Sequence, residues 1–90
     1  MVVLEKTNNK FIGFLMAQHT LDATGLNCPM PILKAKQALA KIEAGDTIEV
    51  TCSDKGSTND FIAFCNQTGN TLLSHEAKDN QFIFNIEKSA

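Results

Sequence analysis

Two alternate prolines mark the expected start of a helix in this chain. Pro29 and Pro31 stand directly before a run with helical periodicity, and the first helical turn tolerates proline because its missing N–H would have had no intrahelical partner. Cys28 precedes both prolines and is therefore expected at a helix N-terminus. The helix dipole and the free backbone N–H groups there favour a thiolate over a thiol. The stretch predicts one activated sulfur nucleophile.

A single apolar stripe follows the prolines. Ile32, Ala35, Leu39 and Ile42 recur at spacings of three, four and three, which predicts a helix from Pro31 to Ala44. Gly45 stands where the glycine after a helix C-terminus belongs.

Alternating polar and apolar residues predict four strands. They span residues 18–23, 46–53, 70–78 and 81–88. Between the second and third strands, Ser57 with Asp60 predicts a capped helix start, and Gly69 predicts its end. The pair Asp79–Asn80 predicts a two-residue hairpin turn between the last two strands.

The expected fold class is an α/β two-layer sandwich with the order βαβαββ. A strand-helix-strand crossover implies parallel pairing of the first two strands, and the terminal hairpin is antiparallel. The result is a four-stranded mixed sheet with two helices packed on one face. The polar positions Thr47, Glu49 and Thr51 fit a second sheet face that is open to water.

Composition excludes several function classes. Apolar residues make up 43% and charged residues 20% of the 90-residue chain, with a net charge of −2, which is typical of an ordinary globular domain. All eight positive charges are lysines, and the chain has no Trp or Tyr. Direct sequence readout of nucleic acid relies on arginine forks and aromatic stacking, so we do not expect it here. No apolar run reaches the ~20 residues of a membrane span.

The cysteines indicate a reducing compartment, hence a cytoplasmic location. Cys28, Cys52 and Cys65 are odd in number and form no C-x-x-C pair, which argues against a disulfide framework or a zinc knuckle. A metal site would have to recruit the scattered His19 and His75, so no metal is predicted. Cys52 and Cys65 fall on apolar faces and are expected in the core, with a resolving thiol as the alternative for Cys65.

The N-terminus is set apart from this pattern. Residues 11–17 form a short apolar run after Lys6 and Lys10, but Glu5 interrupts the basic region. The pattern therefore resembles a signal peptide only weakly. We predict that residues 1–17 are an N-terminal extension, either disordered or upstream of a native start at Met16. The domain itself is expected to span residues 18–90.

Several motifs together resemble the TusA/SirA family of sulfur carriers. They are His19-Thr20-Leu21-Asp22, Gly25, Cys28-Pro29-Met30-Pro31, Gly45-Asp46 and Phe64-Cys65, and the resemblance covers roughly residues 18–88. It implies a βαβαββ sandwich and a sulfurtransferase in which Cys28 accepts a sulfane sulfur as a persulfide from a cysteine desulfurase or similar donor. The sulfur then passes to an acceptor protein. No cofactor beyond this covalent persulfide is implied.

The resemblance leaves the pathway open. Members that feed tRNA thiolation tend to carry Arg, Glu and Arg where this chain has Asn27, Met30 and Asn59. Other members serve sulfur oxidation or molybdenum-cofactor synthesis. The chain therefore looks more like the broad group of C-P-M-P paralogues.

The predicted site is centred on Cys28. Residues expected to support the motif are Asp22, Gly25, Pro29 and Pro31. Residues expected to contact partners are Met30, Lys34 and Lys36. Asp22 would hold the Cys28 loop through backbone N–H groups, and Asp60 would cap its own helix. The lysines are most simply a solvated face, and alternatively a basic strip that steers acidic partners or stabilises the persulfide anion.

Two other function classes stay open at this point. The chain would be a non-catalytic regulatory or adaptor module if it bound a protein partner through the open sheet face or the basic helix. A thiol-redox enzyme would need a resolving cysteine close to Cys28. An adaptor should tolerate Cys28→Ser, and a carrier should not.

Overall fold

The computed structural model describes residues 17–89, and the predicted element order is confirmed. Its six elements, in chain order, are β1 (Gln18–Ala23), α1 (Met30–Leu39), β2 (Thr47–Cys52), α2 (Ser57–Thr68), β3 (Thr71–Lys78) and β4 (Gln81–Glu87). The predicted extension of residues 1–17 lies outside the described residues except for Ala17, and it stays a prediction.

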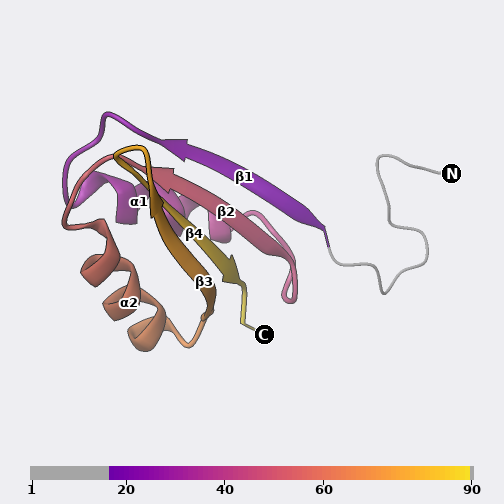
Figure 1. Ribbon diagram of the computed structural model, residues 1–90. Helices are drawn as coiled ribbons and strands as arrows, with labels where there is room; N and C mark the ends of the chain where they lie inside the picture. The colour runs from indigo at the N-terminus through magenta and orange to yellow at the C-terminus, as the bar shows by residue number, and fades with distance from the viewer. Residues whose placement is uncertain (1–16, 90) are drawn as a thin grey trace, which may run out of the picture.

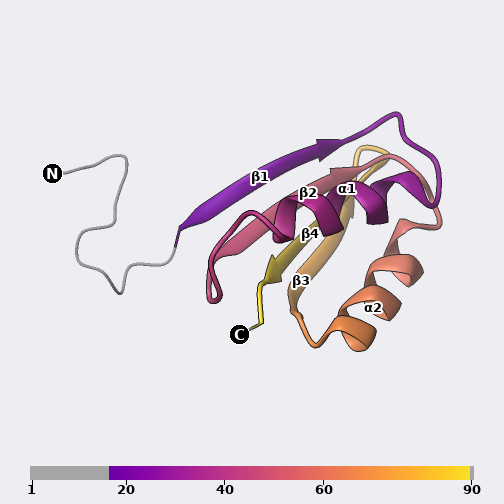
Figure 2. The same cartoon turned by 180° about the vertical axis from the view of Figure 1, so that it is seen from behind.

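The four strands form one mixed sheet in the order β1-β2-β4-β3. β1 pairs with β2 in parallel, from Gln18 opposite Thr47 to Ala23 opposite Cys52. β4 is antiparallel to both β2 and β3. Figures 1 and 2 show α1 and α2 on one side of this sheet. The two-layer α/β sandwich with two helices on one face is therefore confirmed.

The core fills the space between the sheet and the helices. The sheet contributes Ile48, Val50 and Cys52 from β2 and Phe84 and Ile86 from β4, and the helices contribute Ala35, Leu39, Phe61, Phe64 and Cys65. Phe61 of α2 stacks on Phe84 of β4 with ring centroids 4.6 Å apart and planes 23° apart. Each such fully buried aromatic contributes about 1.5–3 kcal/mol by removing apolar surface from water. This packing holds the two helices against the sheet.

The first helix is shorter than predicted. α1 ends at Leu39 and not at Ala44, because the chain continues into tight turns in which the N–H of Ile42 donates to Leu39 O at 3.4 Å. Ile42 still packs into the core, which is why the apolar stripe extended past the helix. Gly45, with φ of 92°, lies in the turn before β2 and does not end the helix.

The start of α2 also differs from the prediction. Within residues 17–89 no side chain caps this helix, and Gly56 occupies the cap position. Ser57 Oγ donates to Asp54 O at 2.6 Å, so the preceding loop takes the place of the predicted Ser57–Asp60 capping box. The helix ends at Gly69, whose φ is 82°, as predicted. The hairpin turn at Asp79 and Asn80 is confirmed by positive φ at both residues.

Candidate functional site

Cys28 lies at the edge of the sheet where the two parallel strands end. It is in the loop between β1 and α1, and the loop between β2 and α2 lies beside it, because parallel pairing brings the ends of β1 and β2 to the same edge. Both helices start at this end of the sheet (Figures 1 and 2). Two βα units therefore meet at Cys28.

Cys28 is the one exposed cysteine of the three. Cys52 and Cys65 are buried in the core, as predicted, and burial raises the pKa of both thiols. The Cys28–Pro29 peptide bond is cis. An exposed thiol beside two buried, inert ones makes Cys28 the sulfur that another protein can reach.

Asp54 links the two loops at this edge. Its Oδ2 accepts a hydrogen bond from the Cys28 N–H at 2.9 Å, and its Oδ1 accepts one from the Gly56 N–H at 3.2 Å. Asp54 was not among the site residues predicted from the sequence. Its signal was present, because Asp54 follows a strand predicted to be parallel to the strand that leads to Cys28.

Cys28 is not the activated thiol that the sequence predicted. A hydrogen bond to Asp60 raises its pKa, and slight desolvation and the negative charges of Asp60 and Asp54 raise it further. Asp60 thus faces the thiol and does not cap its own helix. A carboxylate near a thiol disfavours the thiolate by like-charge repulsion.

The expected N–H groups at the helix start are mostly occupied or missing. Pro29 and Pro31 have no N–H, the Met30 N–H donates to Asn27 O at 2.8 Å, and the Cys28 N–H is taken by Asp54. These N–H groups therefore offer little stabilisation to a Cys28 thiolate, and the negative charges of Asp60 in α2 and of Asp54 in the loop before it oppose one.

Asp22 contacts a different part of the loop from the one predicted. Its Oδ1 accepts hydrogen bonds from Thr24 Oγ1 at 2.6 Å and from the Thr24 N–H at 3.0 Å, and these bonds lower the pKa of Asp22. The Gly25 N–H donates to Ser53 Oγ at 2.8 Å. Asp22 and Gly25 thus shape the turn that leaves β1, while Asp54 makes the bond to Cys28 itself.

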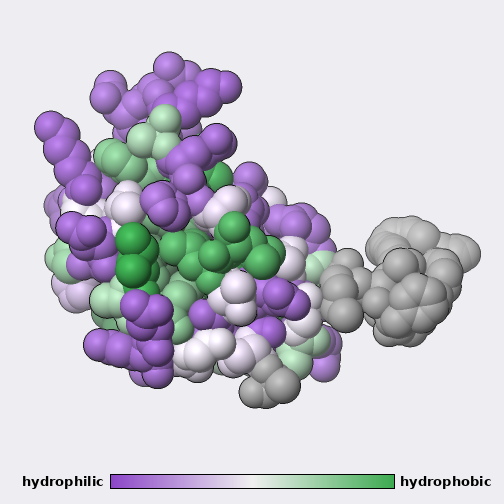
Figure 3. Space-filling model, turned by 60° about the horizontal axis from the view of Figure 1, so that its bottom comes forward, coloured by the Kyte–Doolittle hydropathy of each residue, from purple (hydrophilic) through white to green (hydrophobic). Residues whose placement is uncertain are grey.

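The other predicted residues lie on or beside α1. Pro29 is exposed and precedes the helix, Pro31 is buried in its first turn, and Met30, Lys34 and Lys36 are exposed along it. Two further exposed apolar residues lie on the helices, Leu33 of α1 and Ile62 of α2, and neither was predicted from the sequence. Figure 3 shows apolar side chains gathered on one face with hydrophilic ones around them.

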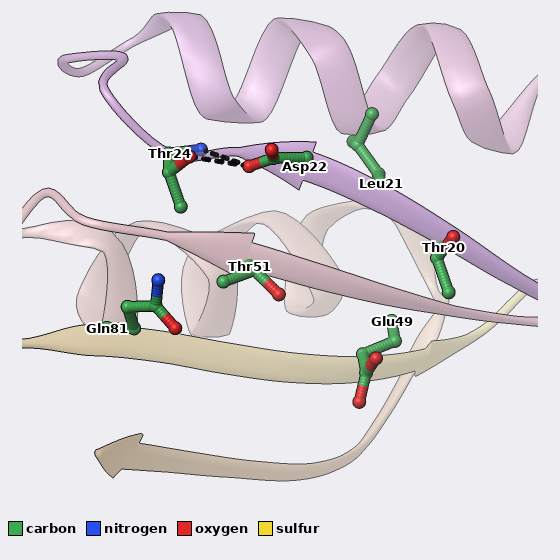
Figure 4. A pocket seen from close by; sticks show the side chains of 7 residues that line it. All are labelled: Thr20, Leu21, Asp22, Thr24, Glu49, Thr51 and Gln81. Carbon is green, nitrogen blue, oxygen red and sulfur yellow. Dashed lines mark hydrogen bonds between the residues drawn. The ribbon is translucent and has the colours of Figure 1, made fainter. Parts of the chain in front are cut away.

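A shallow depression lies on the sheet face opposite the helices. It has a volume of about 300 Å³, and Thr20, Asp22, Thr24, Glu49, Thr51 and Gln81 contribute to its largely polar lining (Figure 4). Cys28 does not line it. The depression is thus separate from the exposed thiol.

Residues 17–89 contain neither a group of side chains suited to a metal ion nor a helix suited to a membrane. In that range no three His, Cys, Asp or Glu side chains form a group that could hold a metal ion. His19 instead bonds to Asp46, with 3.0 Å between Nε2 and Oδ2. No helix in the described range has the length and apolar character needed to cross a membrane.

Comparison with known proteins agrees with this geometry. The sequence matches the family described as Sulfurtransferase TusA over residues 19–88. The sulfur carrier protein TusA of Allochromatium vinosum is 48% identical over 69 residues, which cover 77% of this chain and 91% of that protein. A candidate sulfur carrier of Neisseria meningitidis serogroup A is 47% identical over 72 residues, which cover 80% and 97%.

A solved structure shows the same fold. The crystal structure of a SirA-like protein from Desulfitobacterium hafniense has a TM-score of 0.69 and 29% sequence identity, and the match covers 79% of this chain and 97% of that one. The family match spans both loops that meet at the exposed cysteine. The chain therefore belongs to the TusA/SirA family of sulfur carriers.

Proposed function

We propose that Cys28 is the residue on which this carrier holds sulfur, as a persulfide. The observation that supports the proposal most directly is that Cys28 is the one exposed cysteine, at the edge where both helices begin. Sulfur transfer between two proteins requires their sulfur atoms to touch. The buried Cys52 and Cys65 cannot make such contact without opening the core.

The transfer needs two exchanges at sulfur. Cys28 Sγ, after losing its proton, attacks the outer sulfur of a donor persulfide, and the donor leaves as a thiolate that takes up a proton. An acceptor thiolate then attacks the outer sulfur on Cys28, and Cys28 is released. In this sense the protein acts as a sulfurtransferase. We propose no cofactor other than the covalent persulfide.

The donor class we propose is a cysteine desulfurase or a similar persulfide enzyme, in the cytoplasm. The acceptor is a protein thiol in tRNA thiolation or another branch of sulfur metabolism. Asn27 and Met30 favour the C-P-M-P group over the tRNA-thiolation members. Exposed Met30 and Leu33 would supply apolar contact to either partner, beside the exposed Lys34 and Lys36.

The test is incubation with a cysteine desulfurase and cysteine, followed by intact-mass measurement. We expect one added sulfur, removable by reductant or by cyanide, and absent in Cys28→Ser. Cys65→Ser is the matched control, because it replaces a thiol that is buried, and it should load like the wild type. An adduct that persists in Cys28→Ser but vanishes in Cys65→Ser would overturn the assignment. A Cys28→Ser variant that supports full sulfur transfer to an acceptor would point to the adaptor function instead.

A further inference from the structure

Local hydrogen bonds shape the chain on both sides of Cys28. The Thr24 N–H donates to Asp22 Oδ1 at 3.0 Å, and the Met30 N–H donates to Asn27 O at 2.8 Å. Both partners of each bond belong to the same short segment between β1 and α1. These bonds therefore give the loop its shape, but they do not set its orientation relative to the rest of the domain.

Two further hydrogen bonds join this loop to the loop between β2 and α2. The Gly25 N–H donates to Ser53 Oγ at 2.8 Å, and the Cys28 N–H donates to Asp54 Oδ2 at 2.9 Å. The two acceptors are consecutive residues. Because a single bond would leave the loop free to pivot, the pair restrains both the position of Cys28 and its direction.

The second loop is itself attached to the start of α2. The main-chain oxygen of Asp54 accepts the Ser57 N–H at 3.0 Å and Ser57 Oγ at 2.6 Å, and Ser57 is only 1% exposed. Asp54 Oδ1 accepts the Gly56 N–H at 3.2 Å. The backbone of Cys28 is thus connected through Asp54 to a buried helix start, while Cys28 itself is exposed.

We propose that Ser53 and Asp54 are positioning residues, which orient Cys28 for sulfur transfer between proteins and are not needed for its reaction with small molecules. The inference rests on the proposed function, because it concerns the sulfur exchange at Cys28. It adds Ser53 to the site, and it gives the two bonds between the loops a role in the transfer step.

The requirement follows from the geometry of the exchange. The Cys28 thiolate forms a bond to the outer sulfur of a donor persulfide, and the bond between the two donor sulfur atoms breaks. The electron pair goes to the inner donor sulfur, which leaves as a thiolate and takes up a proton. When two folded proteins dock, a misplacement of about 1 Å can slow such a step about a hundredfold. A small reagent turns freely to meet an exposed thiol, so its reaction does not depend on the orientation of the loop.

The experiment compares a protein donor with small reagents. A cysteine desulfurase is loaded from cysteine, the free cysteine is removed, and transfer to increasing concentrations of this protein is followed by intact mass. We expect the maximal transfer rate to fall about tenfold in Asp54→Ala and about threefold in Ser53→Ala, because each variant lacks one bond between the loops. The concentration that gives half-maximal transfer should stay the same. Loading by inorganic polysulfide and alkylation by iodoacetamide should be at least as fast as in the wild type.

Conservative variants and matched controls distinguish positioning from a merely structural role. Ser53→Thr keeps the hydroxyl acceptor and Asp54→Asn keeps one acceptor oxygen, so both should recover part of the lost transfer rate. Ser74→Ala and Glu76→Gln remove the same kinds of side chain from exposed positions on β3, and they should transfer like the wild type. If Asp54→Ala does not fold, Ser53→Ala decides the question, because Ser53 is exposed.

Three results would overturn the inference and leave Cys28 as the carrier residue. Unchanged transfer in both alanine variants would show that the two bonds are not needed. A change only in the half-maximal concentration would show that Ser53 and Asp54 contact the partner and do not position Cys28. Equal slowing with the protein donor and with small reagents would show a loss of access to the thiol. Failure of the wild type to accept sulfur from the desulfurase is a different result, and it would overturn the donor assignment together with this inference.

Discussion

The two ends of the β1–β2 pair are each organised by one aspartate, in different surroundings. At the end where β2 starts, Asp46 is 7% exposed and accepts three hydrogen bonds, from the Ala17 N–H at 3.1 Å, the Glu43 N–H at 3.1 Å and His19 Nε2 at 3.0 Å. At the end where β2 finishes, Asp54 is half-buried and accepts two backbone N–H groups, those of Cys28 and Gly56.

The comparison shows that an aspartate accepting backbone N–H groups can have two different roles in this domain. The oxygens of Asp46 are enclosed by partners that belong to the fold, and an imidazole is one of them. The oxygens of Asp54 hold the loop that contains Cys28, and the thiol of Cys28 is exposed to solvent. We infer that the Asp46 end mainly stabilises the domain and that the Asp54 end mainly positions the sulfur.

Asp46→Ala should give the largest loss of stability. The substitution leaves two backbone N–H groups and His19 without their acceptor in a largely buried place, which costs about 2–3 kcal/mol of unfolding free energy. Urea denaturation measures this loss. Sulfur loading of Cys28, at the other end of the strands, should be unchanged under conditions where the variant is folded. A folded Asp46→Ala variant whose Cys28 fails to take up sulfur would contradict the inference that the two ends have separate roles.

Asp54→Ala should have a small effect on stability and a larger effect on the reactivity of Cys28. Its two hydrogen bonds are more exposed, so we expect a stability loss of only about 1 kcal/mol. Cys28 should become more reactive, because the negative charge of Asp54 helps to raise the pKa of its thiol. Iodoacetamide alkylation at pH 7.5 should therefore be faster than in the wild type, and Asp46→Ala is the control that should leave it unchanged. Asp54→Asn, which removes the charge and keeps an acceptor oxygen, separates the two effects.

The smallest expected effect is a pH dependence at the Asp46 end. Burial raises the pKa of Asp46, but the hydrogen bonds from His19, Ala17 and Glu43 outweigh it and leave the pKa below its ordinary value of 3.8. The folded state thus binds fewer protons at this group than the unfolded state. Its stabilisation is present above pH 3.8 and is lost as the pH falls through the lower folded value.

The stability difference between the wild type and Asp46→Asn should therefore shrink between pH 6 and pH 3. The lowered pKa of Asp22 is common to both proteins and cancels in the comparison. Urea denaturation at the two pH values measures the difference. A difference that stays constant would show that the Asp46 charge does not contribute to stability.

Most of the fold could be predicted from local patterns. The alternation of Ile48, Val50 and Cys52 along β2 is a property of a few neighbouring residues, and it gave the strand and its buried face correctly. The end of α1 could not be predicted in this way. Ile42 keeps the helical spacing, yet it reaches the core from a turn. Whether the chain at this point is a helix or a turn depends on how it packs on the sheet, and the local sequence does not show that packing.

The surroundings of Cys28 were harder to predict than the residue itself. Its place before two prolines singled it out from sequence, and its exposure is confirmed. Asp54 and Asp60 lie far along the chain and reach it only through the parallel pairing of β1 with β2 and the docking of α2. The prediction from sequence rested only on the helix that starts two residues after Cys28, so the predicted direction of the pKa of this thiol was wrong.

A carrier with one reachable sulfur can serve only one protein at a time. Under the proposed function, both donor and acceptor must reach Cys28, the one exposed cysteine, so their footprints overlap and their binding is mutually exclusive. Each cycle then includes the dissociation of one complex before the next can form, in a ping-pong order. The rate of turnover is bounded by the slower of the two off-rates, so a partner that binds too tightly would stall delivery. Small, short-lived interfaces suit such a protein better than tight ones.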